Sequence, residues 1–291
     1  MTHTFSGIDI ALWDILGQVT GQPVGRLLGG RYRTKVRPYC SLLMEEACAM
    51  FNTVASFKKK GFRAFKIGWG AFGRSDNLAA SEATVEAARN AAGPECQLMV
   101  DAGASDAFWP HRLKWALWTA DMLSAYNVNW FEEPLKPDAL EDYVLLRRAS
   151  RIPIAGGEVL TRRQTFRTWL DKGAFDIVQP DVTKVGGISE QRRIAWMAAD
   201  YGVKFVGHGW NTALGIAADL QLASAIPTTD LVEYIGGSPY VDDITVEGFA
   251  LDSEGYLEIP DRPGLGVTLD PTKLQKYAQA ADVLFEDPGR A

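Results

Sequence analysis

The sequence lacks several features that mark secreted, zinc-binding and membrane proteins. Only three cysteines occur in 291 residues, Cys40, Cys48 and Cys96, with neither CxxC spacing nor partnering histidines. Such a set argues against a disulfide framework or a zinc site, and we expect reduced thiols in a cytoplasm. No run of about 18 apolar residues is long enough to span a membrane. The first residues also lack the basic, apolar and small-residue pattern of a secretory signal, so we expect a cytoplasmic protein without a membrane partner.

Positive charge is also scarce. The chain has 30 Lys and Arg residues against 36 Asp and Glu residues, a formal net charge of −6, and residues 58–60 are its one run of three basic residues. Nucleic acid is therefore not an expected partner, because binding its phosphates requires clustered Lys and Arg. The hydrophobic share of 47% and the charged share of 23% are typical of a globular protein.

Two kinds of segment alternate along most of the chain. Short apolar runs rich in Val, Ile and Phe are followed by longer stretches of helical period, as in βα units around a parallel sheet. One of these stretches, residues 190–202, ends at Gly202 as at a helix C-cap. Eight units predict an α/β fold of the (β/α)8-barrel type, in which functional residues collect at the carboxyl ends of the strands. The predicted strands are residues 36–43, 62–69, 96–102, 128–134, 152–158, 175–182, 203–210 and 230–236.

The two ends of the chain do not follow this alternation. Residues 6–21 are predicted to form an amphipathic helix that begins with a capping-box-like Ser6-x-x-Asp9. Its apolar face needs a partner surface, which the sequence does not reveal. That face consists of Ile8, Leu12, Ile15, Leu16 and Val19. Near the other end, residues 247–267 are rich in turn residues, and a last helix begins near residue 270.

A polar residue lies near the end of each predicted strand from the second to the eighth. In a barrel these side chains converge on one mouth. Any single Asp could instead be the N-cap of the following helix. Glu132 and Glu158, however, lie in apolar surroundings, where an ionised carboxylate needs a cation or hydrogen bonds. The set therefore indicates a functional site made by Lys66, Asp101, Glu132, Glu158, Asp181, His208 and Glu233.

Three of these residues are candidate metal ligands. Asp101, Glu132 and Glu158 come from consecutive strands, so their oxygens can surround one ion. Hard oxygen ligands favour Mg²⁺ over zinc, which prefers His or Cys. Glu132 is followed by Glu133, and successive side chains of a strand face opposite ways. We assign Glu132 to the site and Glu133 to a structural role.

His208 is the candidate base. Asp181 ends the preceding strand, from where its carboxylate can accept the Nδ1 proton and raise the basicity of the imidazole. The other two histidines, His3 and His111, are interpreted as surface residues. Lys184 follows Asp181 by three residues, and we interpret it as a loop lysine that forms a salt bridge.

Trp69, Trp210 and Asn211 flank the predicted mouth. They are candidate substrate-binding residues. Packing of the two indoles at the rim, without contact to substrate, is the alternative.

The motifs of the chain resemble those of the enolase superfamily, specifically its mandelate racemase subgroup. The resemblance runs nearly end to end, and the order and spacing of the motifs make it specific. It implies a modified barrel of the (β/α)7β type, bound Mg²⁺, and removal of the proton α to a carboxylate to give an enediolate. The motifs are SGIDIALWDILGQVTGQPVGRLLGG, FKIG, MVDAG, WFEEPL, IAGGE, QPDVTKVGG, GHGWN and DRPGLGV.

The resemblance also implies a role for each site residue. Asp101, Glu132 and Glu158 correspond to the metal ligands, and Asp181 with His208 to the Asp-His dyad. Glu233 corresponds to the acid that hydrogen-bonds the substrate carboxylate. Lys66 corresponds to the first lysine of a Lys-x-Lys motif, which helps neutralise that carboxylate. The second lysine, the usual base on the opposite face, falls at Gly68 and is missing.

This missing lysine favours elimination over racemisation. Inverting a carbon centre normally needs proton-transfer groups on both faces, whereas one group can remove the α-proton and then protonate a leaving hydroxyl. We therefore predict a Mg²⁺-dependent dehydratase that converts a sugar acid to a 2-keto-3-deoxy acid. Two alternatives stay open: a racemase, epimerase or lactone cycloisomerase with an unrecognised second base, and a catalytically inactive truncated barrel.

The resemblance extends to the arrangement of domains. Relatives in this family carry an N-terminal capping domain over the barrel mouth, and we expect most of it to be missing from this sequence. The division that follows is a remnant of the capping junction in residues 1–35, the barrel in 36–240, and a C-terminal extension toward the capping region in 241–291. Family members are often homo-oligomers, and we expect the same here, with a small-molecule carboxylate as substrate.

Overall fold

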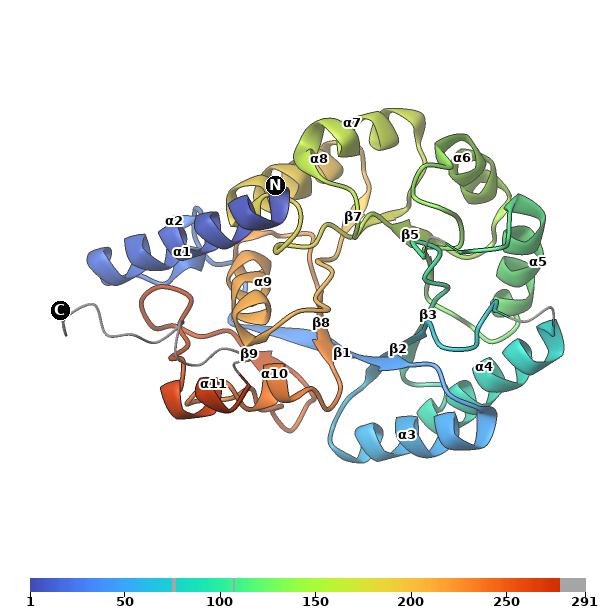
Figure 1. Ribbon diagram of the computed structural model, residues 1–291, viewed down its shortest axis with the longest axis horizontal. Coiled ribbons are helices and arrows are strands. Elements are labelled where there is room, and N and C mark those ends of the chain that lie inside the picture. The colour runs from blue at the N-terminus through green and yellow to red at the C-terminus, as the bar shows by residue number, and fades with distance from the viewer. Residues whose placement is uncertain (75–76, 107, 278–291) are drawn as a thin grey trace.

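Eight parallel strands form a barrel in the computed structural model, which describes residues 1–74, 77–106 and 108–277 (Figure 1). All eight predicted strands are present in the predicted order, most of them shorter than predicted. Their bounds are β1 Lys35–Leu43, β2 Ala64–Gly68, β3 Gln97–Asp101, β4 Phe131–Glu132, β5 Ile154–Gly156, β6 Ile177–Val178, β7 Lys204–Phe205 and β8 Leu231–Ile235.

A helix of ten residues or more follows each of the first seven strands and covers the outside of the barrel (Figure 1). After β8 the four-residue helix α10, Pro239–Asp242, takes the place of an eighth long outer helix. The architecture is therefore the modified (β/α)7β barrel. The seven outer helices are α3 Ala47–Lys59, α4 Leu78–Ala92, α5 Leu113–Ser124, α6 Leu140–Ala149, α7 Arg162–Lys172, α8 Gly187–Asp200 and α9 Ala213–Ala225.

The strands are hydrogen-bonded in the order β7-β6-β5-β4-β3-β2-β1-β8. Beyond the end of β6, the ladder continues as an isolated parallel bridge between Asp181 and His208. Beyond the end of β7, the amide of Gly209 donates a 2.7 Å hydrogen bond to Glu233 Oε2 on β8. These contacts lie at the carboxyl ends of the strands, where the predicted site residues also lie.

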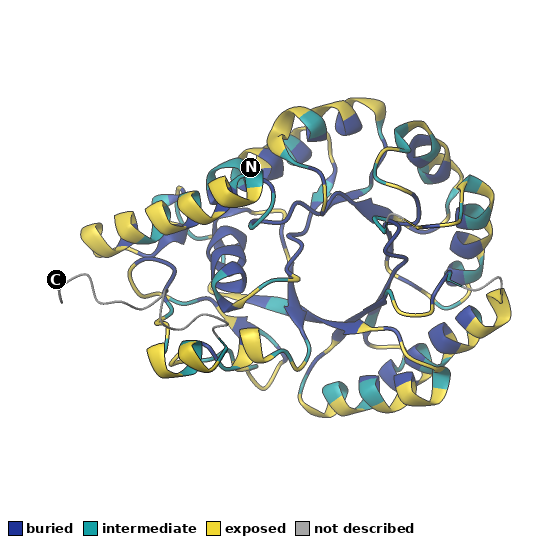
Figure 2. Cartoon of the chain, viewed as in Figure 1, coloured by how far each residue is buried: buried dark blue, intermediate teal, exposed yellow. Residues whose placement is uncertain are grey.

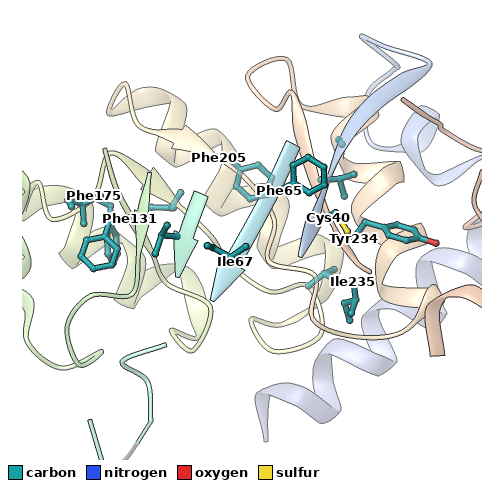
Figure 3. Packing of buried hydrophobic residues seen from close by; sticks show 14 of the residues in the cluster. Cys40, Phe65, Ile67, Phe131, Phe175, Phe205, Tyr234 and Ile235 are labelled. Atoms are coloured by element: carbon teal, nitrogen blue, oxygen red, sulfur yellow. The ribbon is translucent and has the colours of Figure 1, made fainter. Parts of the chain in front are cut away.

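Two hydrophobic layers hold the barrel. The inner layer takes one side chain from each strand or its immediate flank. Residues that alternate with these, such as Phe65, Ile67 and Phe131, belong to the larger cluster between the strands and the helices (Figure 3). This alternation is the period of two expected of a strand. The inner layer consists of Tyr39, Ala64, Met99, Trp130, Ala155, Ile177, Val206 and Leu231.

The N-terminal helix α1, Thr2–Thr20, begins earlier than predicted. Ser6 is not its N-cap, because it lies a full turn inside the helix, where its hydroxyl donates to Thr2 O at 2.9 Å. Ser6 Oγ accepts from Gly186 N, and Asp9 Oδ2 accepts from Ser189 N, so both predicted capping residues instead attach α1 to α8. The capping-box prediction was therefore wrong, since tertiary contacts use these two side chains.

The predicted apolar face of α1 is exposed along its length (Figure 2). Its five residues are between 45% and 81% accessible. The helix instead packs through the opposite side, where Ile10 and Gly17 are buried and Trp13 Nε1 donates to Ser189 Oγ at 2.8 Å. No other surface covers the exposed face within the described residues.

The C-terminal part of the chain returns along the outside of β1. Strand β9, Leu257–Glu258, pairs antiparallel with the start of β1, and α11 spans Pro271–Tyr277. Helix α2, Val24–Leu27, packs against α9 and leads into the barrel. Residues 278–291 of the predicted C-terminal extension lie outside the described residues. Across the described ranges, no helix is both long enough and apolar enough to cross a membrane.

Candidate active site

The site residues form the layer directly above the inner hydrophobic layer. Because strand side chains repeat their facing every two residues, the position two beyond each inner-layer residue also faces the barrel axis. Most of the predicted set follows this step. The residues two positions after seven inner-layer residues are Ser41, Lys66, Asp101, Glu132, Gln179, His208 and Glu233. They follow Tyr39, Ala64, Met99, Trp130, Ile177, Val206 and Leu231, in that order.

Two predicted residues, Glu158 and Asp181, do not follow this step. After Ala155 on β5, Gly157 occupies the layer position with a φ of +114°, and Glu158 follows it. A Cβ at Gly157 would lie 2.9 Å from the Phe166 ring, so glycine is needed there. Asp181 comes four residues after Ile177, and the layer position between them is Gln179, which the sequence analysis missed.

Lys66 is buried among three carboxylates. Its Nζ lies 2.5 Å from Glu132 Oε1, 2.9 Å from Glu233 Oε1 and 3.4 Å from Asp101 Oδ2. Burial alone would lower the pKa of this amine, but the charges of the carboxylates outweigh it and hold the pKa well above its usual value. Lys66 is therefore a fixed cation and not a base.

The candidate ligands Asp101, Glu132 and Glu158 converge. One oxygen of each lies within 4.8 Å of the others, and all three residues are buried. Glu132 is oriented from its other side, since Oε2 accepts hydrogen bonds from Trp130 Nε1 at 2.9 Å and Gln179 Nε2 at 2.7 Å. Gln179 could have been found from the sequence by counting two residues from Ile177.

Negative charge in this cluster exceeds what the neighbouring cations offset. Burial, followed by the charge of Glu132, raises the pKa of Asp101 well above its usual value. Burial and the charges of Glu158 and Asp101 do the same to the pKa of Glu133, whose Oε2 is buried without a partner in the described ranges. A divalent cation suits such a group, because three converging hard oxygens bind Mg²⁺ and its charge offsets theirs.

His208 lies between two carboxylates. Its Nδ1 is 2.7 Å from Asp181 Oδ2, and its Nε2 is 2.8 Å from Glu158 Oε2. Burial would lower the pKa of the imidazole, but the charges of Glu158 and Glu233 and the bond to Asp181 hold it well above the usual value. Asp181 is held in turn by Thr183, whose amide and hydroxyl both donate to Oδ1. The dyad predicted from the sequence is therefore present as a geometric pair.

Glu158, which contacts the Nε2 side of His208, is ionised. Burial would raise its pKa, but His208, Lys184 and Lys66 outweigh it and lower the pKa below its usual range. Lys184 Nζ is 3.4 Å from Glu158 Oε1 and 3.5 Å from Asp181 Oδ2. Lys184 does form salt bridges, as predicted, but its partners are site carboxylates, which the sequence analysis did not foresee.

Glu233 is an ionised acceptor in this structure. Burial would raise its pKa, but the charges of Lys66 and His208 and the bond from Gly209 N lower it. In this state it cannot donate a hydrogen bond. The predicted role of Glu233 is to act as an acid toward the substrate carboxylate. This role requires Glu233 to take up a proton when the carboxylate gains a second negative charge as it becomes an enediolate.

A cavity of about 330 Å³ opens above these residues. Trp69 and Trp210 both line it, whereas Asn211 lines a neighbouring cavity of about 620 Å³ that shares Trp210. The amide atoms of Asn211 are covered by protein, so its predicted role in substrate binding is not evident in the geometry. The lining of the first cavity is Ser41, Leu42, Leu43, Lys66, Gly68, Trp69, Asp101, Glu158, Lys184, His208 and Trp210.

Gly68 lines the cavity at the end of β2. It is the register partner of Asp101, and a Cβ at this position would lie 2.6 Å from Asp101 Cβ and 2.9 Å from Asp101 O. Trp69 continues this wall with a φ of +58°, its indole so close to Gly103 that a Cβ there would lie 2.6 Å from the ring. A side chain at residue 68 therefore requires β2 and β3 to shift.

The chain matches known proteins over most of its length. Residues 49–273 match the family model of the enolase C-terminal domain-like proteins. The chain is 36% identical to D-galactarolactone cycloisomerase of Agrobacterium fabrum, covering 94% of this chain and 73% of that protein. It is 32% identical to D-xylonate dehydratase of Haloferax volcanii, covering 97% and 71%.

A solved structure gives the same match in three dimensions. The crystal structure of a predicted mandelate racemase from Rhodobacter sphaeroides superposes with a TM-score of 0.85 at 32% identity, covering 94% of this chain and 70% of that one.

Gly68→Ala tests how closely β2 and β3 approach. We expect the added methyl group to lower the free energy of unfolding by about 1–3 kcal/mol, because it must displace Asp101 backbone atoms. Denaturant unfolding measures this change. The control is Gly7→Ala in α1, where no atom lies within 4 Å of the added Cβ and where alanine favours the helix. A Gly68→Ala protein as stable as the wild type would contradict the close approach.

Proposed function

This chain belongs to the enolase superfamily, in its mandelate racemase subgroup, and from that membership we propose that it is a Mg²⁺-dependent lyase that dehydrates a sugar acid. The substrate is a carboxylate with hydroxyls on C2 and C3, and the product is a 2-keto-3-deoxy acid. The observation that carries the proposal is the position of the basic groups around the cavity.

The candidate base lies on one side of the cavity only. His208 and Lys184 share the carboxylates of Glu158 and Asp181, so they lie on the same side. At the end of β2, which lies opposite β7 in Figure 1, the described lining offers Gly68 and Trp69, neither of which can move a proton. Lys66 is held as a cation by its three carboxylates. One-sided proton transfer supports elimination, in which a single group can serve twice.

His208 serves both steps in this proposal. The unprotonated Nε2 removes the proton from C2 of the substrate, and the C–H electron pair moves into the carboxylate to form an enediolate. The enediolate collapses, the C3–O bond breaks, and the proton on Nε2 passes to the departing oxygen to form water. The resulting enol takes a proton from solvent at C3, releases its C2 hydroxyl proton to solvent, and becomes the keto acid. Asp181 holds Nδ1 protonated throughout.

Lys66 and Glu233 act on the substrate carboxylate in the proposed mechanism. The ammonium of Lys66 stabilises the second negative charge that develops there. Glu233 lies 2.9 Å from that ammonium and 3.9 Å from His208 Nε2, so all three groups face the same small volume. Trp69 and Trp210 exclude water from the sides of the cavity.

Asp101, Glu132 and Glu158 would hold Mg²⁺ in the proposed enzyme. When bound, the ion supplies Lewis-acid polarisation of the substrate carboxylate, which makes the C2 proton more acidic. With the ion held there, Glu158 would have a counter-ion other than the imidazolium, which would leave His208 Nε2 available as a base.

The relatives support this reaction and also a second candidate. The relative from Haloferax volcanii is named D-xylonate dehydratase, which supports the proposed lyase activity. D-galactarolactone cycloisomerase of Agrobacterium fabrum, at a higher identity, favours a cycloisomerase instead. Racemisation or epimerisation is less well supported, because the second lysine position is Gly68.

Replacing the proposed base should slow turnover strongly. With Mg²⁺ and a panel of sugar acids and lactones, we expect the wild-type chain to form a 2-keto acid and His208→Asn to be slower by about 10²- to 10⁴-fold. Detection of the keto acid measures the rate. The matched control is His111→Asn, because His111 stacks on Trp115 outside the cavity lining. Full activity of His208→Asn would exclude the histidine as the base.

Running the same panel in D₂O separates the two candidate functions. Dehydration predicts a keto acid that carries solvent deuterium at C3. Exchange or inversion at C2 without a keto product would instead indicate a racemase or epimerase, and opening of a lactone would indicate a cycloisomerase.

Mg²⁺ should bind the three carboxylates and stabilise the fold. At about 100 times its dissociation constant, a ligand that binds only the folded state adds about 2.7 kcal/mol of stability. We expect Mg²⁺ to raise the Tm of the wild type and Glu158→Gln to lose most of this increase. The control is Glu141→Gln, a carboxylate on the exposed surface of α6. A wild-type Tm indifferent to Mg²⁺ would support an inactive barrel.

A further inference from the structure

Two buried polar residues behind the dyad have no part in the proposed chemistry. Gln191 on α8 is completely buried, and Asp219 on α9 is 4% exposed. Gln191 Nε2 donates to Asp219 Oδ1 at 3.0 Å. All residues of α9 except Leu214 are buried, so an acid there costs free energy unless it is paired or neutral.

The pair is attached to both strand ends that carry the dyad. Gln191 Nε2 also donates to Pro180 O at 2.9 Å, and Pro180 directly precedes Asp181. The same carbonyl accepts the amide of His208 at 3.2 Å. Pro180 O therefore joins the chain beyond β6 to the chain beyond β7, and Gln191 holds this junction from behind.

Gly207 shows how closely the pair fits the strand end. A Cβ on Gly207, the residue before His208, would lie 2.9 Å from Asp219 Oδ1 and 3.2 Å from Gln191 Nε2. The polar pair thus packs directly against the backbone that carries the histidine. A shift of the pair would move this backbone, because packed interiors transmit displacement.

Resting on the proposed function, we propose that Gln191 and Asp219 are positioning residues that set the distance and angle between Asp181 and His208 through Pro180 O and the Gly207 backbone.

The charge state of Asp219 is consistent with this role. Burial and the charge of Asp181 raise the pKa of Asp219 well above its usual value, which favours its neutral form. A neutral acid beside Asp181 adds no competing negative charge to the dyad. In that form it offers a donor at Oδ2; Asp219 Oδ2 and Gln191 Oε1 are both buried and have no hydrogen-bond partner in the described part of the chain. An acid and an amide can satisfy each other in this way.

Three variants separate positioning from simple stability. Gln191→Met keeps the volume but removes the bond to Pro180 O, and Asp219→Ala removes the anchor of Gln191. Asp219→Asn keeps a neutral acceptor at the Oδ1 position. We expect Gln191→Met and Asp219→Ala to lower kcat about tenfold with KM changed less than about twofold, and Asp219→Asn to retain kcat within about twofold.

A proton resonance gives a readout that does not depend on turnover. The Nδ1 proton of His208, bonded to Asp181, should give a low-field signal that disappears in His208→Asn. We expect Gln191→Met and Asp219→Ala to shift or broaden this signal and Asp219→Asn to leave it in place. The control is Thr119→Val, since Thr119 is a buried polar residue on α5, remote from these two strand ends.

Each outcome supports or overturns the inference. It is overturned if Gln191→Met leaves both kcat and the signal unchanged, or if Asp219→Asn loses as much as Asp219→Ala. Should Gln191→Met fail to fold, the comparison of Asp219→Asn with Asp219→Ala decides alone. If the wild type turns over no acid while Gln191→Met still shifts the signal, the proposed function fails and the positioning role stands.

Discussion

An excess of buried negative charge at the barrel mouth is the constraint on which the site depends. The cations within reach are Lys66, Lys184 and His208. The carboxylates are twice as many, namely Asp101, Glu132, Glu133, Glu158, Asp181 and Glu233. Charges in such surroundings are tolerated only when they are paired or neutralised. The raised pKa values of Asp101 and Glu133 are one response of the chain, and binding of a divalent cation is the other.

The barrel supplies the rigidity that this crowding requires. The inner hydrophobic layer lies directly below the charged layer. A carboxylate of the site therefore cannot reach water by turning toward the inside of the barrel. Backbone amides and neutral side chains then orient individual oxygens, as Gly103 does for Asp101 and Gln179 for Glu132. These fixed hydrogen bonds hold the carboxylates in place despite their mutual repulsion. The site is therefore ordered before its ligands bind.

Much of this arrangement could be predicted from the sequence, because it follows from local patterns. The strand repeat placed the eight strands in order, and the period of two brings Lys66, Asp101, Glu132, His208 and Glu233 to one layer. The convergence of the acidic trio follows from their places on neighbouring strands.

What could not be predicted depends on contacts between distant segments. Ser6 and Asp9 have the pattern of a helix cap, but the structure uses them to attach α1 to α8. Gln191 and Asp219 are 28 residues apart in the chain, lie on two different helices and have no sequence motif. Lys184 was correctly expected in a salt bridge, yet its partners are known only once the strand ends meet. The same holds for the clash that a Cβ at Gly68 would make with Asp101, since only the strand register reveals it.

The close approach of β2 and β3 at Gly68 and Asp101 also limits which substitutions the site can accept. An amine at position 68 needs more than the substitution itself, because a β-carbon there would lie 2.6 Å from Asp101 Cβ, on a residue of the proposed metal site. The two strands must also move apart, through changes at other positions. A second proton-transfer group at the end of β2 is therefore tied to the spacing of the whole strand pair and not to one residue alone.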